Sequence, residues 1–170
     1  MRLMPVSDAM FLVGESREMP MHIGGVNLYT LPDKVDETEW LNEQLGILRQ
    51  SEGLRRPFSE ILKLTPLGQY GPIRLEPDRD IDMHYHVRSA ALPKPGRYRE
   101  MFELVSRLHG PLLDRTRPMW EITLISGLPD RQIATYFKIH HALMDGAASM
   151  HFTNAMLSAD KSERRSYSPM

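Results

Sequence analysis

Two neighbouring apolar segments constrain the fold of this chain more than any other feature. Residues 120–128 (WEITLISGL) alternate apolar and polar side chains at first, and residues 133–141 (IATYFKIHH) are apolar over most of their length. Both patterns indicate strands, and the sequence GLPDR at 127–131 is typical of a turn. We therefore predict two strands that pair as a hairpin, the second of them mostly buried.

Helix and strand signals alternate along the rest of the chain. We predict helices at residues 7–13, 36–51, 97–112 and 146–159 and strands at residues 22–31 and 81–92. Asp36 has the position of a helix cap, with Glu39 three residues later, and Ser7 or Asp8 is expected to cap the first helix. The Pro- and Gly-rich stretch 53–82 predicts turns with short extended pieces. This order predicts an α/β fold, a mixed β-sheet flanked by helices in two layers.

The composition fits one globular domain and excludes several classes of function. The chain has 170 residues and a net charge of −1, so it lacks the basic field of a nucleic-acid binder. It has no cysteine, which excludes disulfides, thiolate catalysis and Cys-ligated metals and fits a reducing compartment such as the cytoplasm. No apolar run approaches the ~20 residues that span a bilayer, and no signal peptide is evident. We expect residues 1–160 to form the domain and the polar tail 161–170 to be disordered.

The stretch HHALMDG at residues 140–146 is the most informative for chemistry, because it joins the last predicted strand to the last predicted helix. Strand ends in helix-covered sheets often carry sites, and histidine transfers protons near neutral pH. Neighbouring side chains on a strand point to opposite faces, so only one of His140 and His141 can easily face a given cavity. Their parity along the strand favours neither. Asp145 can hold a neighbouring side chain across the turn, and Gly146 permits backbone conformations that other residues resist.

Each of these residues also has a simpler interpretation. A histidine pair at a strand end can be structural, and Asp145 can be only the N-cap of the following helix. A metal site built from His140, His141 and Asp145 is a third interpretation, but consecutive histidines on a strand chelate one metal poorly. We therefore expect no metal here. The 12 methionines are either core filler or the lining of an adaptable binding surface.

Four blocks distributed along the chain resemble those of a known family. The pattern H-H-x-x-x-D-G at 140–146 resembles the signature of the CoA-dependent acyltransferase superfamily, which includes chloramphenicol acetyltransferases and peptide-synthetase condensation domains. PVSDAMFL at 5–12 and PMHIGG at 20–25 resemble the first blocks of the wax ester synthase/diacylglycerol acyltransferase family. RPMWE at 117–121 resembles its Pro-Leu-Trp motif, with Met119 in place of the usual Leu. The resemblance extends over nearly the whole chain.

The resemblance implies the N-terminal, chloramphenicol acetyltransferase-like half of a two-domain enzyme. Members of the family are considerably longer, and motifs of their second domain are not found in this sequence. Residues 161–170 would then begin an interdomain linker. In the family the site lies in a tunnel between the two halves, so the C-terminal half of the same protein is an expected partner.

The implied reaction transfers a fatty acyl group from acyl-CoA to the hydroxyl of diacylglycerol or of a long-chain alcohol, with no acyl-enzyme and no cofactor. His141 matches the family's general base and His140 a supporting residue. Asp145 matches a residue that holds the local architecture, and Gly146 a position that leaves room for the substrate. Lipid acceptors imply peripheral contact with the inner membrane or with lipid droplets.

Two other functions stay as alternatives: acyl transfer to a soluble acceptor, and lipid binding by a non-catalytic half-domain. Within the resembling blocks, Pro118 and Trp120 look structural, with Trp120 packed beneath the site. Long acyl chains need an apolar channel, and some methionines are candidates to line it. These candidates are Met19, Met21, Met144 and Met150.

Overall fold

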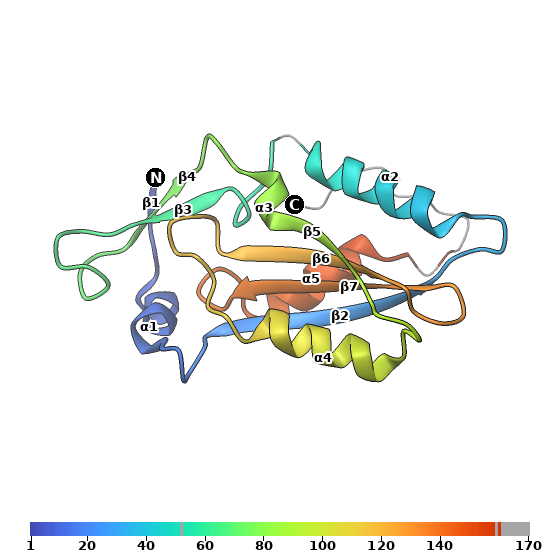
Figure 1. The fold of residues 1–170 in the computed structure, drawn as a ribbon. Coiled ribbons are helices and arrows are strands. Elements are labelled where there is room, and N and C mark those ends of the chain that lie inside the picture. The colour runs from blue at the N-terminus through green and yellow to red at the C-terminus, as the bar shows by residue number, and fades with distance from the viewer. Residues whose placement is uncertain (52, 159, 161–170) are drawn as a thin grey trace.

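The computed structural model describes residues 1–51, 53–158 and 160 (Figure 1). Its main sheet has four strands in the order β2–β7–β6–β5. These strands are β2 (His22–Thr30), β7 (Gln132–His140), β6 (Trp120–Ser126) and β5 (Val87–Ala91). β7 is antiparallel to both β2 and β6, whereas β5 and β6 are parallel, so the sheet is mixed as predicted. The predicted tail at 161–170 lies outside the described residues.

The β6–β7 hairpin is confirmed. Its register pairs Trp120 with Ile139 at the open end and Ile125 with Ala134 near the turn. Gly127 adopts a φ of +83°, a backbone conformation that glycine reaches without steric cost. The hairpin can therefore reverse direction where the sequence GLPDR predicts a turn.

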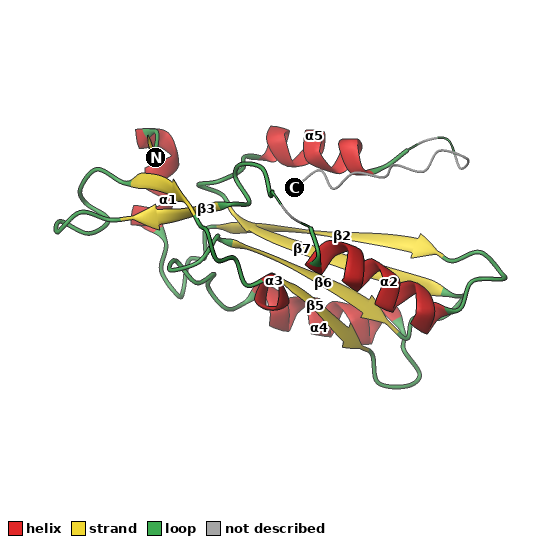
Figure 2. Cartoon of the chain, turned by 90° about the horizontal axis from the view of Figure 1, so that it is seen from above, coloured by secondary structure: helices red, strands yellow, loops and turns green. Residues whose placement is uncertain are grey.

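Helices cover both faces of the main sheet, which makes three layers instead of the two predicted. α2 (Glu37–Arg49) and α5 (Gly146–Met156) pack on the face that carries Ile122 and Ile139. α4 (Tyr98–His109) packs on the opposite face, against Tyr136 (Figure 2). The reason is visible in the central strands, because β6 and β7 bury side chains that point to both faces and so need cover on both.

Local capping explains where α2 begins. The Asp36 side chain accepts hydrogen bonds from the backbone N–H groups of Thr38 and Glu39, each at 2.9 Å. These bonds satisfy amides that have no partner within the helix. The predicted cap is confirmed.

The stretch predicted as turns with short extended pieces contains two short strands, which form a second, smaller sheet with the N-terminus. Its strands are antiparallel and lie in the order β1 (Arg2–Leu3), β4 (Arg74–Pro77) and β3 (Glu60–Lys63). α1 (Val6–Gly14) packs next to it, with Leu12 and Leu75 in a shared core. α1 begins after Pro5 with no side-chain cap, so the prediction of Ser7 or Asp8 as its cap is wrong.

The predicted strand at 81–92 is half wrong. Its first part forms the short helix α3 (Met83–His86), and only β5 is extended. The Asp82 side chain accepts a hydrogen bond from Tyr85 N–H at 3.1 Å and so favours the helical turn. Among the helices of the described part of the chain, none has the length and apolar character that crossing a membrane requires.

Candidate active site

The two histidines of the HHALMDG stretch lie at the end of the main sheet next to α1 (Figure 1). His140 is the last residue of β7, and its N–H donates to the carbonyl of Met119, at 3.0 Å. His141 follows in a turn, and its N–H donates to the carbonyl of Met21, at 2.8 Å. Backbone carbonyls directly before β6 and β2 therefore hold the pair, and the turn frees His141 from strand geometry.

The His140 ring is fully buried and has polar partners at both nitrogens. Nδ1 accepts a hydrogen bond from Ala142 N–H at 3.1 Å, and Nε2 lies 3.3 Å from Glu15 Oε1. Burial lowers the pKa of His140, which the Glu15 carboxylate opposes. A neutral ring that accepts at Nδ1 carries its proton on Nε2, the nitrogen that lies near the carboxylate.

The His141 ring has a different environment. It stacks on Phe11 of α1, with ring centroids 3.9 Å apart and an interplanar angle of 24°. Its Nδ1 is buried and has no hydrogen-bond partner among the described residues. Among the described residues, neither His140 Nε2 nor His141 Nδ1 makes a hydrogen bond. The two rings differ in exposure, because His140 is fully buried and His141 is partly exposed.

Glu15, directly after α1, is a site residue that the sequence analysis missed. Its side chain is fully buried, Oε1 accepts from Met21 N–H at 3.1 Å, and Oε2 accepts from Arg115 at 3.0 Å. Although burial raises the pKa of Glu15, the Met21 N–H, His140 and Arg115 together hold it below its ordinary value. A single glutamate after an apolar helix gave no pattern that could have marked it.

Asp145 and Gly146 have structural positions at the start of α5. Asp145 Oδ1 accepts from Ala148 N–H at 2.7 Å, as the N-cap that the simpler interpretation predicts. Gly146 is the first residue of α5, and its φ is not in the left-handed region, so the expectation of a special backbone conformation is wrong. A Cβ built on Gly146 would meet no atom within 4 Å, so this position is open.

The other residues named from the sequence divide between core and surface. Trp120 is fully buried, its indole N–H donates to the Phe58 carbonyl at 2.8 Å, and its ring stacks on His86. Met144 is buried in the core, whereas Met19 and Met150 are exposed. In the described part of the chain, no group of three or more His, Asp or Glu residues is placed to hold a metal ion.

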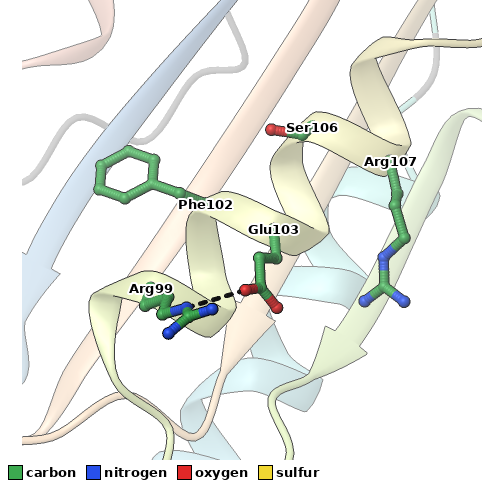
Figure 3. A pocket seen from close by; sticks show the side chains of 5 residues that line it. All are labelled: Arg99, Phe102, Glu103, Ser106 and Arg107. Carbon is green, nitrogen blue, oxygen red and sulfur yellow. Dashed lines mark hydrogen bonds and ion pairs between the residues drawn. The ribbon is translucent and has the colours of Figure 1, made fainter.

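Two surface hollows lie away from the histidines. One, of about 670 Å³, lies on the outer side of α4, where Arg99 and Glu103 form an ion pair beside Phe102 (Figure 3). The other, of about 550 Å³, lies between α1 and the loop that contains Tyr70. Neither hollow is lined by His140 or His141.

The arrangement of the elements defines a structural class, the fold that condensation domains share. The tallysomycin biosynthesis protein TlmII superposes on 88% of this chain with a TM-score of 0.57 at 14% identity. The starter condensation domain of rhizomide synthetase RzmA superposes on 87% with a TM-score of 0.54 at 12% identity. At such identities the likeness shows the fold alone.

Within this class the family is shown by sequence. Residues 4–170 match the wax ester synthase/diacylglycerol acyltransferase catalytic domain, and the chain belongs to this family. A wax ester synthase/diacylglycerol acyltransferase from Marinobacter aquaeolei VT8 superposes on 92% of this chain and 38% of its own, with a TM-score of 0.84 and 39% identity.

Curated relatives give the same result. A Mycobacterium tuberculosis protein named "Probable diacyglycerol O-acyltransferase tgs2" is 44% identical over 160 residues, 94% of this chain and 35% of its own length. The O-acyltransferase WSD of Acinetobacter baylyi is 37% identical over 165 residues, 96% of this chain and 34% of its own. The chain thus spans about a third of the length of these relatives.

Proposed function

We propose that this chain carries the histidine-bearing part of an acyltransferase that moves a fatty acyl group from acyl-CoA to a lipid hydroxyl. The acceptor is diacylglycerol or a long-chain alcohol, and the products are triacylglycerol or a wax ester and free CoA. Membership of the family supports this proposal, as do relatives named diacylglycerol O-acyltransferase and O-acyltransferase WSD. No cofactor takes part, since acyl-CoA is a co-substrate with an already activated thioester.

His141 is the proposed general base, and one observation carries this assignment. Of the two histidines, His140 is fully buried, whereas His141 is partly exposed and so can be reached by an acceptor hydroxyl. A general base needs a free nitrogen within reach of the hydroxyl proton that it takes. His140 then has a supporting role, and Asp145 shapes the turn by capping α5.

The proposed step is a direct transfer. His141 takes the proton of the acceptor hydroxyl while the oxygen attacks the thioester carbonyl carbon. The carbon–sulfur bond of the resulting tetrahedral intermediate then breaks, and the proton passes from His141 to the CoA sulfur. The ester and CoA leave without an acyl-enzyme. Gly146, where a side chain would meet no other atom of this chain within 4 Å, would leave room for the substrate.

Two partners belong to the proposal. The relatives are about three times as long as their matching part, so we propose that a C-terminal half completes the site around His141. A lipid acceptor further implies peripheral contact with a membrane or a lipid droplet.

The test measures thiol release from acyl-CoA by the full-length protein, with diacylglycerol, a long-chain alcohol or a short soluble alcohol as acceptor. His141→Ala should lower the rate by about 10²–10⁴-fold, the usual contribution of a general base. His151→Ala, an exposed histidine on α5, is the matched control and should leave the rate unchanged. Turnover only with the short alcohol would favour the soluble-acceptor alternative. Lipid binding with no turnover would favour the non-catalytic half-domain.

A further inference from the structure

The end of α1 reaches both histidines at once. Phe11 in the last turn of α1 stacks on the His141 ring, and Glu15, four residues later, faces His140 Nε2 at 3.3 Å. Residues four apart lie on the same side of a helical turn, so one side of this segment meets the whole pair. α1 is therefore more than a cover for the small sheet.

Glu15 is held with a precision that an ordinary surface glutamate lacks. Its carboxylate is fully buried between elements that are remote in sequence, and Arg115 on the far side is 100 residues away. Arg115 is fixed in turn by the carbonyl of Leu12 at 2.8 Å and by the side-chain oxygen of Gln69 at 2.9 Å. A buried carboxylate is costly unless such partners compensate its charge. Here they fix its two oxygens in place.

The same carboxylate is connected to His141 by two routes. Oε1 accepts from Met21 N–H, and the carbonyl of Met21 accepts from His141 N–H. Oε1 also faces Nε2 of His140, whose Nδ1 accepts from Ala142 N–H in the turn that carries His141. Both the backbone of His141 and the residue after it are therefore linked to Glu15.

We infer that Glu15, paired with Arg115, is a positioning residue for His141. The negative charge of the carboxylate, 3.3 Å from Nε2, favours the tautomer of neutral His140 that has its proton on Nε2, so that Nδ1 stays an acceptor for Ala142 N–H. If the proton moved to Nδ1, two N–H groups would face each other and the turn would open. The inference rests on the proposed function, because it concerns how the proposed base is held.

The test uses the full-length protein with ¹⁵N-labelled histidine and two variants. Glu15→Ala removes both acceptor oxygens, and Glu15→Gln keeps one oxygen for Met21 N–H but removes the charge. The ring nitrogens of His140 should report an Nε2-protonated ring in the parent protein and a mixture of tautomers in Glu15→Ala. Glu18→Gln, an exposed glutamate of the same segment, is the control and should leave the spectrum unchanged.

Turnover is the second readout. Glu15→Ala should lower kcat by about 10–100-fold, as losing an outer-shell carboxylate does in other sites, with KM for acyl-CoA within about twofold. Glu15→Gln should fall between the parent and Glu15→Ala, and it serves alone if Glu15→Ala does not fold. An unchanged His140 tautomer together with an unchanged kcat in the folded variant would overturn the inference.

Failure of the proposed function would look different. If His141→Ala retained full turnover, the base assignment would be wrong, while the His140 spectrum would still show whether Glu15 sets the tautomer. The opposite result is an inactive His141→Ala, with both Glu15 variants matching the parent in His140 tautomer and in kcat. Only the positioning role of Glu15 would then be wrong.

Discussion

Two buried histidines are register partners on neighbouring strands and are held in different ways. His22 on β2 pairs with His140 on β7, so their side chains share one face of the sheet. His22 Nε2 lies 2.6 Å from the carbonyl oxygen of His109, at the end of α4. His140 Nε2 instead faces the Glu15 carboxylate. Two neighbouring polar sites thus differ in whether their partner carries a negative charge.

The polar residues around the end of α4 form a set that we call the α4 cluster: His22, His109, Tyr136 and Lys138. In this cluster the buried Lys138 ammonium donates to the carbonyls of Leu108 and Pro111, where the last carbonyls of α4 lack helical partners. The α4 cluster therefore ties a helix end to the sheet, whereas Glu15 and His140 order the turn that carries His141. We expect the first to govern stability and the second to govern turnover.

The largest expected effect is on the pH dependence of stability. Burial, the Lys138 charge and the His109 charge lower the pKa of His22 to about 4 from 6.5, against the opposing His109 carbonyl and Glu15. As the pH falls, His22 is therefore protonated in the unfolded chain at a higher pH than in the folded chain. The free energy of unfolding is therefore unaffected by His22 above pH 6.5. It decreases as the pH falls from 6.5 to about 4, by up to about 3 kcal/mol.

His22→Gln should flatten this dependence, measured as the free energy of urea unfolding across the same pH window. The other histidines whose pKa burial lowers, His86, His109 and His140, leave a residual slope of the same sign. The exposed His84 offers the control His84→Gln, which should keep the parent slope. If the pH dependence of unfolding were the same in His22→Gln and His84→Gln, His22 would not be protonated differently in the folded and unfolded chain.

Lys138→Met comes next in size. Removing the ammonium leaves the carbonyls of Leu108 and Pro111 without their donor, at a cost of about 2 kcal/mol in the free energy of unfolding. Turnover per folded molecule should stay at the parent value. Lys34→Met, at an exposed position, is the control and should change neither quantity. A lower kcat in folded Lys138→Met would mean that the α4 cluster also contributes to turnover, together with Glu15 and His140.

Local signals explain what the sequence predicts well here. The hairpin follows from apolar runs on either side of the turn GLPDR, and the start of α2 follows from its N-cap Asp36, because a cap bonds only to the next few residues. Capping also explains the wrong prediction at the start of 81–92. Asp82 is the cap of the short helix α3, and the residues of this helix have a composition that is also typical of a strand. The sequence predicts short extended pieces at 53–82 but not their pairing into a sheet with the N-terminus, because strands of two to four residues carry too little pattern to show their partners.

The site was predictable only where it is contiguous. His140, His141 and Asp145 share one short stretch, and the likeness of that stretch to a known signature made them candidates. Glu15 depends on Arg115, 100 residues away, and on His140 at the end of β7. Nothing local distinguishes it from an exposed glutamate such as Glu18. Partners of this kind become visible only when the chain is folded.

Asp145→Ala tests whether Asp145 governs stability, like the α4 cluster, or turnover, like Glu15 and His140. As the N-cap of α5, Asp145 should contribute about 1 kcal/mol to the free energy of unfolding, and Asp145→Asn should retain most of it. Thermal or urea unfolding of both variants checks the value, with turnover measured beside it. Parent-like stability with lost turnover in Asp145→Asn would mean that capping is not the whole role of Asp145 and that its carboxylate charge acts in the candidate site.

Phe11→Leu has the smallest expected effect and separates the two routes from α1 to His141. Leucine keeps an apolar contact but loses the stacked ring, an interaction worth about 0.5–1.5 kcal/mol, so kcat should fall by about two- to tenfold. The exposed Phe102 on α4 supplies the control Phe102→Leu, which should not change kcat. If folded Phe11→Leu turns over as the parent does, the backbone bond from His141 to Met21 and the Glu15 carboxylate behind it suffice to place the base.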